Sequence, residues 1–195
     1  MSSELSALKS AVREMGKRYP DRYDRARRLY VQERAVALQN DRDTEYKIKA
    51  EVHKYFDIPY SDVLFAGSVQ LGFSAYKDTL FTPSRSDLDI ACVNTRLFQR
   101  AWIDVIEESS AFSNGAAFGS MKAREIELFK ESILKRGMIK ISGMPNSQLA
   151  VRWRQYEASL TRRYATHFGG VTVAIYMNEY AFCWKQDSSL KLVCG

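Results

Sequence analysis

Residues 63–93 decide the fold, and they read VLFAGSVQLGFSAYKDTLFTPSRSDLDIACV. Both ends of this stretch are apolar and rich in β-branched residues, so the sequence predicts one strand over residues 63–66 and another over residues 87–93. Because side chains alternate between the two faces of a strand, Asp87 and Asp89 should share one face, and the apolar residues around them should point into the core. The sequence therefore predicts two carboxylates side by side on one face of a sheet.

The carboxylate pair itself predicts a cation site. Two like charges on one face repel each other, and a protein tolerates them when a proton or a cation lies between them. Mg²⁺ and Mn²⁺ prefer hard oxygen ligands, bind through one or two carboxylates, and complete their shells with water and substrate phosphates. We therefore expect Asp87 and Asp89 to be metal ligands.

A phosphate site is expected where the first strand ends. Gly67 permits a close approach of the backbone, and Ser68 is expected to cap a short helix that begins there. Free N–H groups and the positive dipole end of a helix start attract phosphate. The loop over residues 74–85 then places Lys77 and Arg85 within reach of a triphosphate, although an ordinary solvated role is the alternative for each. The pattern predicts a nucleoside triphosphate site.

The Gly-Ser pair, the helix after it and the Asp-x-Asp strand together resemble the signature of the polymerase-β-like nucleotidyltransferase superfamily, over roughly residues 44–94. The resemblance implies that Gly67 and Ser68 hold a triphosphate such as ATP. It also implies that Asp87 and Asp89 are catalytic metal ligands, and that a nucleotidyl group passes to a hydroxyl acceptor. Acceptors in that family include RNA ends, proteins, antibiotics and other nucleotides, and prokaryotic members serve in toxin–antitoxin pairs and phage-defence signalling.

The chain departs from the family pattern at a third carboxylate, which a later strand supplies in that family. The expected strands over residues 138–141 and 171–177 contain no Asp or Glu. Glu179 is expected at a helix start, and Asp187 in a polar helix or loop. A third carboxylate helps to activate the attacking hydroxyl, so its absence should impair catalysis more than nucleotide binding. The alternative to an active enzyme is therefore a catalytically impaired protein that binds nucleotide, nucleic acid or a protein partner.

The rest of the chain is mostly helical in pattern. Helices are expected over residues 4–18, 21–39, 44–56, 96–108, 121–136, 147–167 and 178–190. With the strands they predict an α/β (α+β) fold, a mixed sheet of about four or five strands with helices on one face and N-terminal helices bracing it. We expect one domain over residues 1–195, in which residues 1–43 are N-terminal helices and residues 44–195 form the sheet core and C-terminal helices.

Positive charge is unevenly distributed in this chain of net charge +6. Lys and Arg outnumber Asp and Glu by 9 to 5 in residues 1–40 and by 10 to 4 in residues 117–169, whereas residues 41–116 carry 8 against 12. Basic segments around an acidic one suit a metal site that attracts triphosphates or RNA, although solvated helix faces are the alternative. The helix over residues 147–167 sets arginines beside aromatics, which is typical of nucleic-acid binding or of aromatics turned inward. A basic nucleic-acid-binding module that retains the fold as scaffold is thus a third functional hypothesis.

Composition and cysteine usage favour a cytoplasmic protein. The chain is 46% hydrophobic and 27% charged, as globular domains are, and no apolar run approaches a membrane span. The first four residues lack a basic segment followed by an apolar one. Cys92, Cys183 and Cys194 show no metal-ligand spacing and fit a reducing compartment. We expect no membrane partner, and the sequence does not indicate an oligomeric state.

Overall fold

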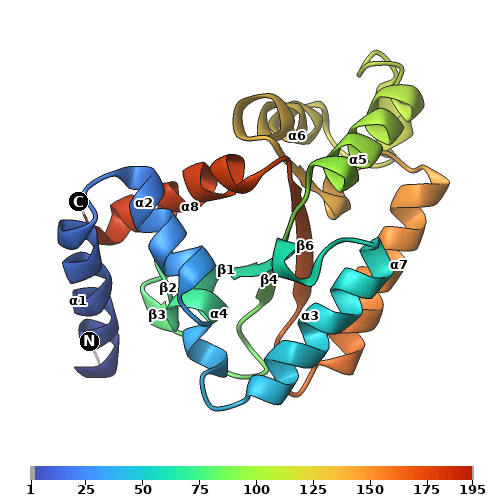
Figure 1. The fold of residues 1–195 in the computed structure, drawn as a ribbon. Helices are drawn as coiled ribbons and strands as arrows, with labels where there is room; N and C mark the ends of the chain where they lie inside the picture. Colours follow the sequence, from blue (N-terminus) through green and yellow to red (C-terminus); the bar gives the residue numbers. More distant parts are fainter. Residues whose placement is uncertain (1–2, 195) are drawn as a thin grey trace.

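A computed structural model describes residues 3–194, and within that range it contains a four-stranded mixed sheet, a two-stranded sheet and eight α-helices (Figure 1). The predicted mixture of helices with one mixed sheet is confirmed. The expectations for Met1, Ser2 and Gly195 lie outside the described residues. Within residues 3–194, no helix is both long enough and apolar enough to cross a membrane.

The main sheet has the strand order β1-β4-β6-β5. Its strands are β1 (Val63–Ala66), β4 (Leu88–Val93), β6 (Val171–Tyr176) and β5 (Met138–Lys140). β4 pairs with β6 in parallel and with β1 antiparallel, and β5 pairs antiparallel with β6. The strand that carries the two aspartates is therefore a central strand, next to the apolar strand β6.

One face of the sheet is covered by three long helices, which Figure 1 places together. These are α3 (Arg42–Phe56), α5 (Thr95–Glu108) and α7 (Gln148–Arg163). The apolar residues of β4 that face them, among them Leu88 and Ile90, are 0% and 1% exposed. The burial of these side chains is the main stabilising contribution on this face.

The other face is covered at one end only. There α1 (Ser3–Arg18), α2 (Arg22–Arg27) and α8 (Glu179–Cys194) share a second apolar cluster with the sheet. The helix α6 (Ala123–Arg136) packs beside β5 and α8, and its buried side chains belong to the first core. The expectation that helices pack on one face is therefore wrong. Both faces are apolar near this end, because Leu64, Ala66 and Ala91 also face away from the first core.

The second helix is much shorter than the predicted range of residues 21–39. It becomes a π-helical turn (Arg28–Gln32), stops at Glu33, and is followed by a 3₁₀ turn (Val36–Leu38). The buried amide of Gln70 donates to the carbonyl oxygens of Leu29 and Glu33, at 2.8 and 3.0 Å. A side chain from another element thus binds the carbonyls where the helix ends, and the local sequence does not show this contact.

The loop expected over residues 74–85 contains a small hairpin, β2 (Phe73–Ser74) and β3 (Thr79–Leu80), which follows the short helix α4 (Gly67–Leu71). Further 3₁₀ turns cover Tyr60–Asp62, Gly115–Phe118 and Ile141–Gly143. The hairpin stands over the open part of the second sheet face, so it forms one wall of the site described next.

Several helix ends agree with the sequence. Asn94 and Ser147 cap α5 and α7, because their side-chain oxygens accept from the N–H groups of Leu97 and Ala150. Gly137 ends α6 in the left-handed conformation, with φ 56°. These caps fix where each helix leaves the sheet.

Candidate functional site

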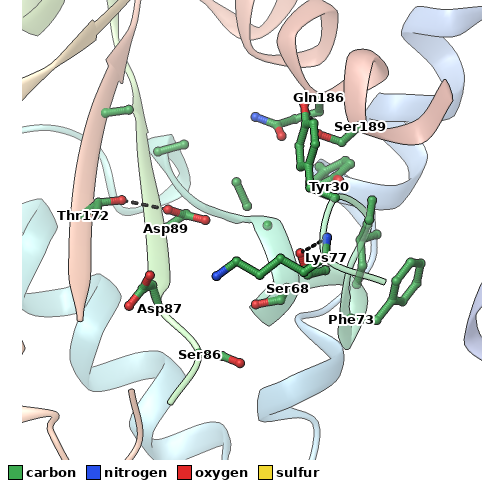
Figure 2. A pocket seen from close by; sticks show the side chains of 18 of the residues that line it. Tyr30, Ser68, Phe73, Lys77, Ser86, Asp87, Asp89, Thr172, Gln186 and Ser189 are labelled. Carbon is green, nitrogen blue, oxygen red and sulfur yellow. Dashed lines mark hydrogen bonds between the residues drawn. The ribbon is translucent and has the colours of Figure 1, made fainter. Parts of the chain in front are cut away.

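A cavity of about 570 Å³ lies between the open face of the sheet, α4, the β2–β3 hairpin and α8 (Figure 2). Its walls come from segments that are distant in the sequence. All six residues that the sequence singled out for metal or nucleotide binding line it: Gly67, Ser68, Lys77, Arg85, Asp87 and Asp89. The structure therefore brings the whole predicted set together.

The two aspartates lie at one end of the cavity, as Figure 2 shows. Asp87 directly precedes β4 and is exposed, whereas Asp89 lies within β4 and is half-buried. Their apolar neighbours Leu88 and Ile90 are buried on the opposite face. The predicted alternation is confirmed, and it presents two carboxylates to the same solvent-filled space.

The position next to the aspartates on β6 is a threonine. Thr172 pairs with Asp89 in the parallel register, and its hydroxyl donates to Asp89 Oδ1 at 2.8 Å. Ala174 and Tyr176 continue the same face of β6 and also line the cavity. The strand beside the carboxylate pair thus supplies a neutral hydrogen-bond donor in place of a third carboxylate.

The two acids that follow the expected last strand in the sequence pair with arginines and do not line this cavity. Glu179 begins α8, accepts from the Tyr23 hydroxyl at 2.8 Å, pairs with Arg27 at 2.9 Å, and lines a different cavity. Asp187 lies within α8, where it pairs with Arg25 at 2.5 Å and with a lysine one turn later. Within residues 3–194 no group of three His, Cys, Asp or Glu side chains is placed to hold a metal ion.

Gly67 is required by the approach of Asp89. Its φ is +62°, and a Cβ added there would lie 2.3 Å from Asp89 Oδ2. Only glycine combines this backbone conformation with so little space. The carboxylate therefore rests directly against the loop backbone, which fixes the position of the loop relative to the acidic end of the cavity.

Ser68 lines the cavity but does not cap α4. The helix begins at Gly67 after an extended Ala66, and no side chain caps it. The prediction of a Ser68 cap is wrong, because Ser68 is already the second residue of α4. The residue directly before the helix is Ala66, which has no side-chain oxygen. The Ser68 hydroxyl lies on the wall of the cavity in its first turn.

Two basic residues close the acidic end of the cavity. Lys77 lies in the β2–β3 hairpin, and Figure 2 shows its side chain reaching across the cavity toward the aspartates. Arg85 lies in the segment between β3 and β4 and also lines the cavity. Neither forms an ion pair within the described part of the chain. Both positive charges are thus available to an anionic ligand.

Sequence reasoning missed the opposite wall of the cavity. Lys140 of β5 and four further side chains line it: Tyr30, Lys185, Gln186 and Ser189. Burial lowers the pKa of Lys185. The spacing of 185, 186 and 189 matches one helix face, but the apolar residues of α8 are distributed around the helix. The sequence therefore gave no signal of which face meets the cavity.

Two of the aromatics that the sequence sets beside the arginines of α7 point into the core, and two of these arginines have partners in the protein. Trp153 and Tyr164 are 4% and 7% exposed, so these aromatics point inward. Arg154 donates to the Met144 carbonyl at 2.9 Å, and Arg163 pairs with Glu51. The inward-facing alternative is thus the one observed for this helix.

The acidic end of the cavity fits a hard divalent cation. Asp87 and Asp89 take part in no ion pair within residues 3–194, and carboxylate oxygens are the ligands that Mg²⁺ and Mn²⁺ prefer. Comparisons of the chain with protein-family models, with curated proteins and with solved structures found no match. The functional proposal therefore rests on the residues of this cavity.

Proposed function

We propose that the protein binds a nucleoside triphosphate together with Mg²⁺ or Mn²⁺ in this cavity, and that it is a nucleotidyltransferase-like protein. One observation carries the proposal. Two carboxylates without a protein cation share a cavity with Ser68, Lys77 and Arg85. A metal bound to a triphosphate supplies the positive charge that the carboxylates lack, and the basic residues neutralise the remaining phosphate charge.

In the proposed reaction an acceptor hydroxyl attacks the α-phosphorus, the bond from this phosphorus to the bridging oxygen breaks, and pyrophosphate leaves. Asp87 and Asp89 would hold the cation, which supplies electrostatic stabilisation of the transferring group. Lys77 and Arg85 would orient the triphosphate. An RNA end or a protein side chain would serve as acceptor, and phage defence or a toxin–antitoxin pair would be the setting that the resemblance suggests.

A second function, nucleotide binding without efficient transfer, is favoured by Thr172. This residue occupies the strand position beside Asp89, and its hydroxyl already donates to that carboxylate. The site then holds one metal firmly and lacks a carboxylate to share a second one. Transfer would be slow, and the protein would act through binding nucleotide or a partner.

Thermal unfolding with ATP, GTP, CTP and UTP, each with Mg²⁺ and with EDTA, tests the proposal. A ligand that binds only the folded state stabilises it by about 2.7 kcal/mol at a hundred times its Kd. We expect a rise in Tm that needs both nucleotide and metal. An unchanged Tm with all four nucleotides at millimolar concentration would contradict the site assignment.

Transfer of label from each α-³²P nucleotide to RNA or to protein then separates the two functions. An active transferase labels an acceptor at an ordinary enzymatic rate, and the label is lost in Asp89→Asn. The nucleotide-binding function instead predicts the metal-dependent rise in Tm with little or no labelled product.

A further inference from the structure

The end of the cavity away from the aspartates contains two polar side-chain atoms without a partner in the described part of the chain. Tyr30 is 2% exposed and lines the cavity, yet its hydroxyl takes part in no hydrogen bond within residues 3–194. Gln186 is 4% exposed, and its Nε2 donates to the Tyr176 hydroxyl at 3.3 Å. No hydrogen bond to Gln186 Oε1 is formed in the same range. Both unpaired atoms belong to side chains that line the cavity, so a ligand there can complete their hydrogen bonding.

The walls around these groups are aromatic. Phe73 of β2 is fully buried, Tyr76 lines the cavity from the hairpin turn and is largely exposed, and Tyr176 lies at the end of β6. Figure 2 shows Gln186 and Tyr30 at this end, opposite the aspartates. Apolar ring surfaces with one amide and a few hydroxyls suit a flat, polar-edged ligand, and a nucleobase has that chemistry.

The geometry points to a nucleobase subsite formed by Tyr30, Gln186 and the aromatic wall, in which Gln186 selects adenine. This inference rests on the proposed function, because it places the base of the same nucleotide whose phosphates meet the aspartates. It adds what the acidic end does not determine, namely which nucleotide the protein prefers.

The choice of adenine follows from the amide. A glutamine side chain presents one acceptor and one donor, and adenine offers the matching 6-amino donor and ring-nitrogen acceptor on one edge. We place the N7 edge of the base toward Gln186, and on this edge guanine offers two acceptors, O6 and N7, so Gln186 Oε1 would face O6 without a proton between them. The Tyr30 hydroxyl is a further donor or acceptor at the same end of the cavity.

Binding of ATP, GTP, CTP and UTP with Mg²⁺, measured by calorimetry, tests the subsite. A bidentate contact of this kind corresponds to about 5- to 150-fold discrimination, so ATP should bind at least several-fold more tightly than GTP. Gln186→Met keeps a side chain of similar length and removes both polar atoms, so it should bring the four affinities together. Inorganic triphosphate with Mg²⁺ should bind equally well to wild type and to this variant.

Tyr30→Phe provides an independent test that removes one hydroxyl and leaves the ring. It should lower ATP affinity by about three- to tenfold. Tyr23→Phe is the matched control, because Tyr23 lies in α2, two turns before Tyr30, and its hydroxyl donates to Glu179, outside the cavity. That control should leave ATP affinity unchanged.

The outcomes separate this inference from the proposed function. If nucleotides and inorganic triphosphate all fail to bind, the proposed function is wrong and the subsite has no ligand. If nucleotides bind with Mg²⁺ but without a preference for ATP, or if the preference survives in Gln186→Met, the adenine subsite is overturned and the metal–triphosphate site stands. If Gln186→Met does not fold, an unchanged ATP affinity in Tyr30→Phe overturns the subsite by itself.

Discussion

Two pairs of acidic residues lie near the second face of the sheet, and they differ in the partners of their carboxylates. On α8, Glu179 and Asp187 are held by protein cations, Arg27 for the first and Arg25 for the second. On β4, Asp87 and Asp89 meet only a neutral hydroxyl within the described chain. The side chain of Asp187 is 3% exposed, whereas the β4 pair faces an open cavity.

The difference separates carboxylates that protein cations hold in place from carboxylates that are available to a ligand. A buried carboxylate that joins two helices needs a protein cation, because an unpaired buried charge would unfold the contact. A carboxylate pair that faces solvent without a cation costs little in the folded protein and keeps its binding capacity. We therefore propose different roles for the two pairs, and the distinction rests on their partners rather than on their sequence context.

The largest effect is expected for the ion pair of Arg25 with Asp187. Arg25→Ala should destabilise the protein by about 3 kcal/mol in urea unfolding, because it leaves Asp187 buried with only an exposed lysine as partner. Lys17→Ala, which breaks an exposed pair with Glu14, is the control and should cost less than about 1 kcal/mol. Equal losses in the two variants would remove the distinction between the acidic pairs.

A smaller loss is expected where the loop meets Asp89. Gly67→Ala combines an unfavourable φ of +62° with a contact of 2.3 Å to the carboxylate, and should cost about 1–3 kcal/mol. It should also displace the carboxylate and weaken any nucleotide-dependent rise in Tm. Gly115→Ala is the matched control, because nothing lies within 4 Å of its added Cβ. If both variants keep wild-type stability and binding, the close approach of Asp89 to Gly67 contributes to neither.

Thr172→Asp converts the neutral neighbour into a third carboxylate. Like charges directly opposite Asp89 should lower stability by about 1 kcal/mol in EDTA, and Mg²⁺ should restore it. Thr172→Val, which removes only the hydrogen bond, should respond to Mg²⁺ no more than wild type does. If Thr172→Asp labels an acceptor from α-³²P ATP faster than wild type, position 172 limits transfer. If Mg²⁺ does not relieve the destabilisation of Thr172→Asp, the result contradicts a metal site at this end of the cavity.

The smallest effect is expected for Glu157, a carboxyl that forms no ion pair within residues 3–194 and does not line the cavity of the β4 aspartates. Burial raises the pKa of Glu157 above its ordinary value of 4.5, and the carboxylate accepts from the Val173 N–H at 2.5 Å. A raised folded-state pKa contributes stability below pH 4.5 that is lost as the pH rises through the folded value. Glu157→Gln keeps an acceptor and should flatten this decline, whereas Glu127→Gln on exposed α6 should not. Parallel pH profiles of unfolding for wild type and Glu157→Gln would contradict this sign.

Local patterns in the sequence predicted most of the fold and one end of the site. Alternation in residues 87–93 placed both aspartates on one face, and the helices expected over residues 96–108 and 121–136 agree with α5 and α6. These features depend on neighbouring residues only. They therefore appear in a single sequence without knowledge of tertiary contacts.

Long-range contacts account for what the sequence did not predict. The second helix ends after Gln32, where the Gln70 side chain donates to two backbone carbonyls. Gln70 is far from this helix end in the sequence. The contribution of Gln186 to the cavity depends on which face of α8 meets the sheet, and a helix with apolar residues on several sides does not show it. Nor does the sequence show that Glu179 and Asp187 pair with arginines of α2.

The most direct test of the β4 pair is the Tm of wild type, Asp87→Asn and Asp89→Asn with a nucleoside triphosphate and Mg²⁺, against the same proteins in EDTA. Asp57→Asn, an exposed aspartate at the end of α3, is the control for loss of one charge. We predict that both β4 variants keep or slightly exceed wild-type Tm in EDTA, because one repulsive charge is removed, and lose the metal-dependent rise that Asp57→Asn retains. Marked unfolding of the β4 variants with the nucleotide response intact would contradict the account, because it would make the pair structural.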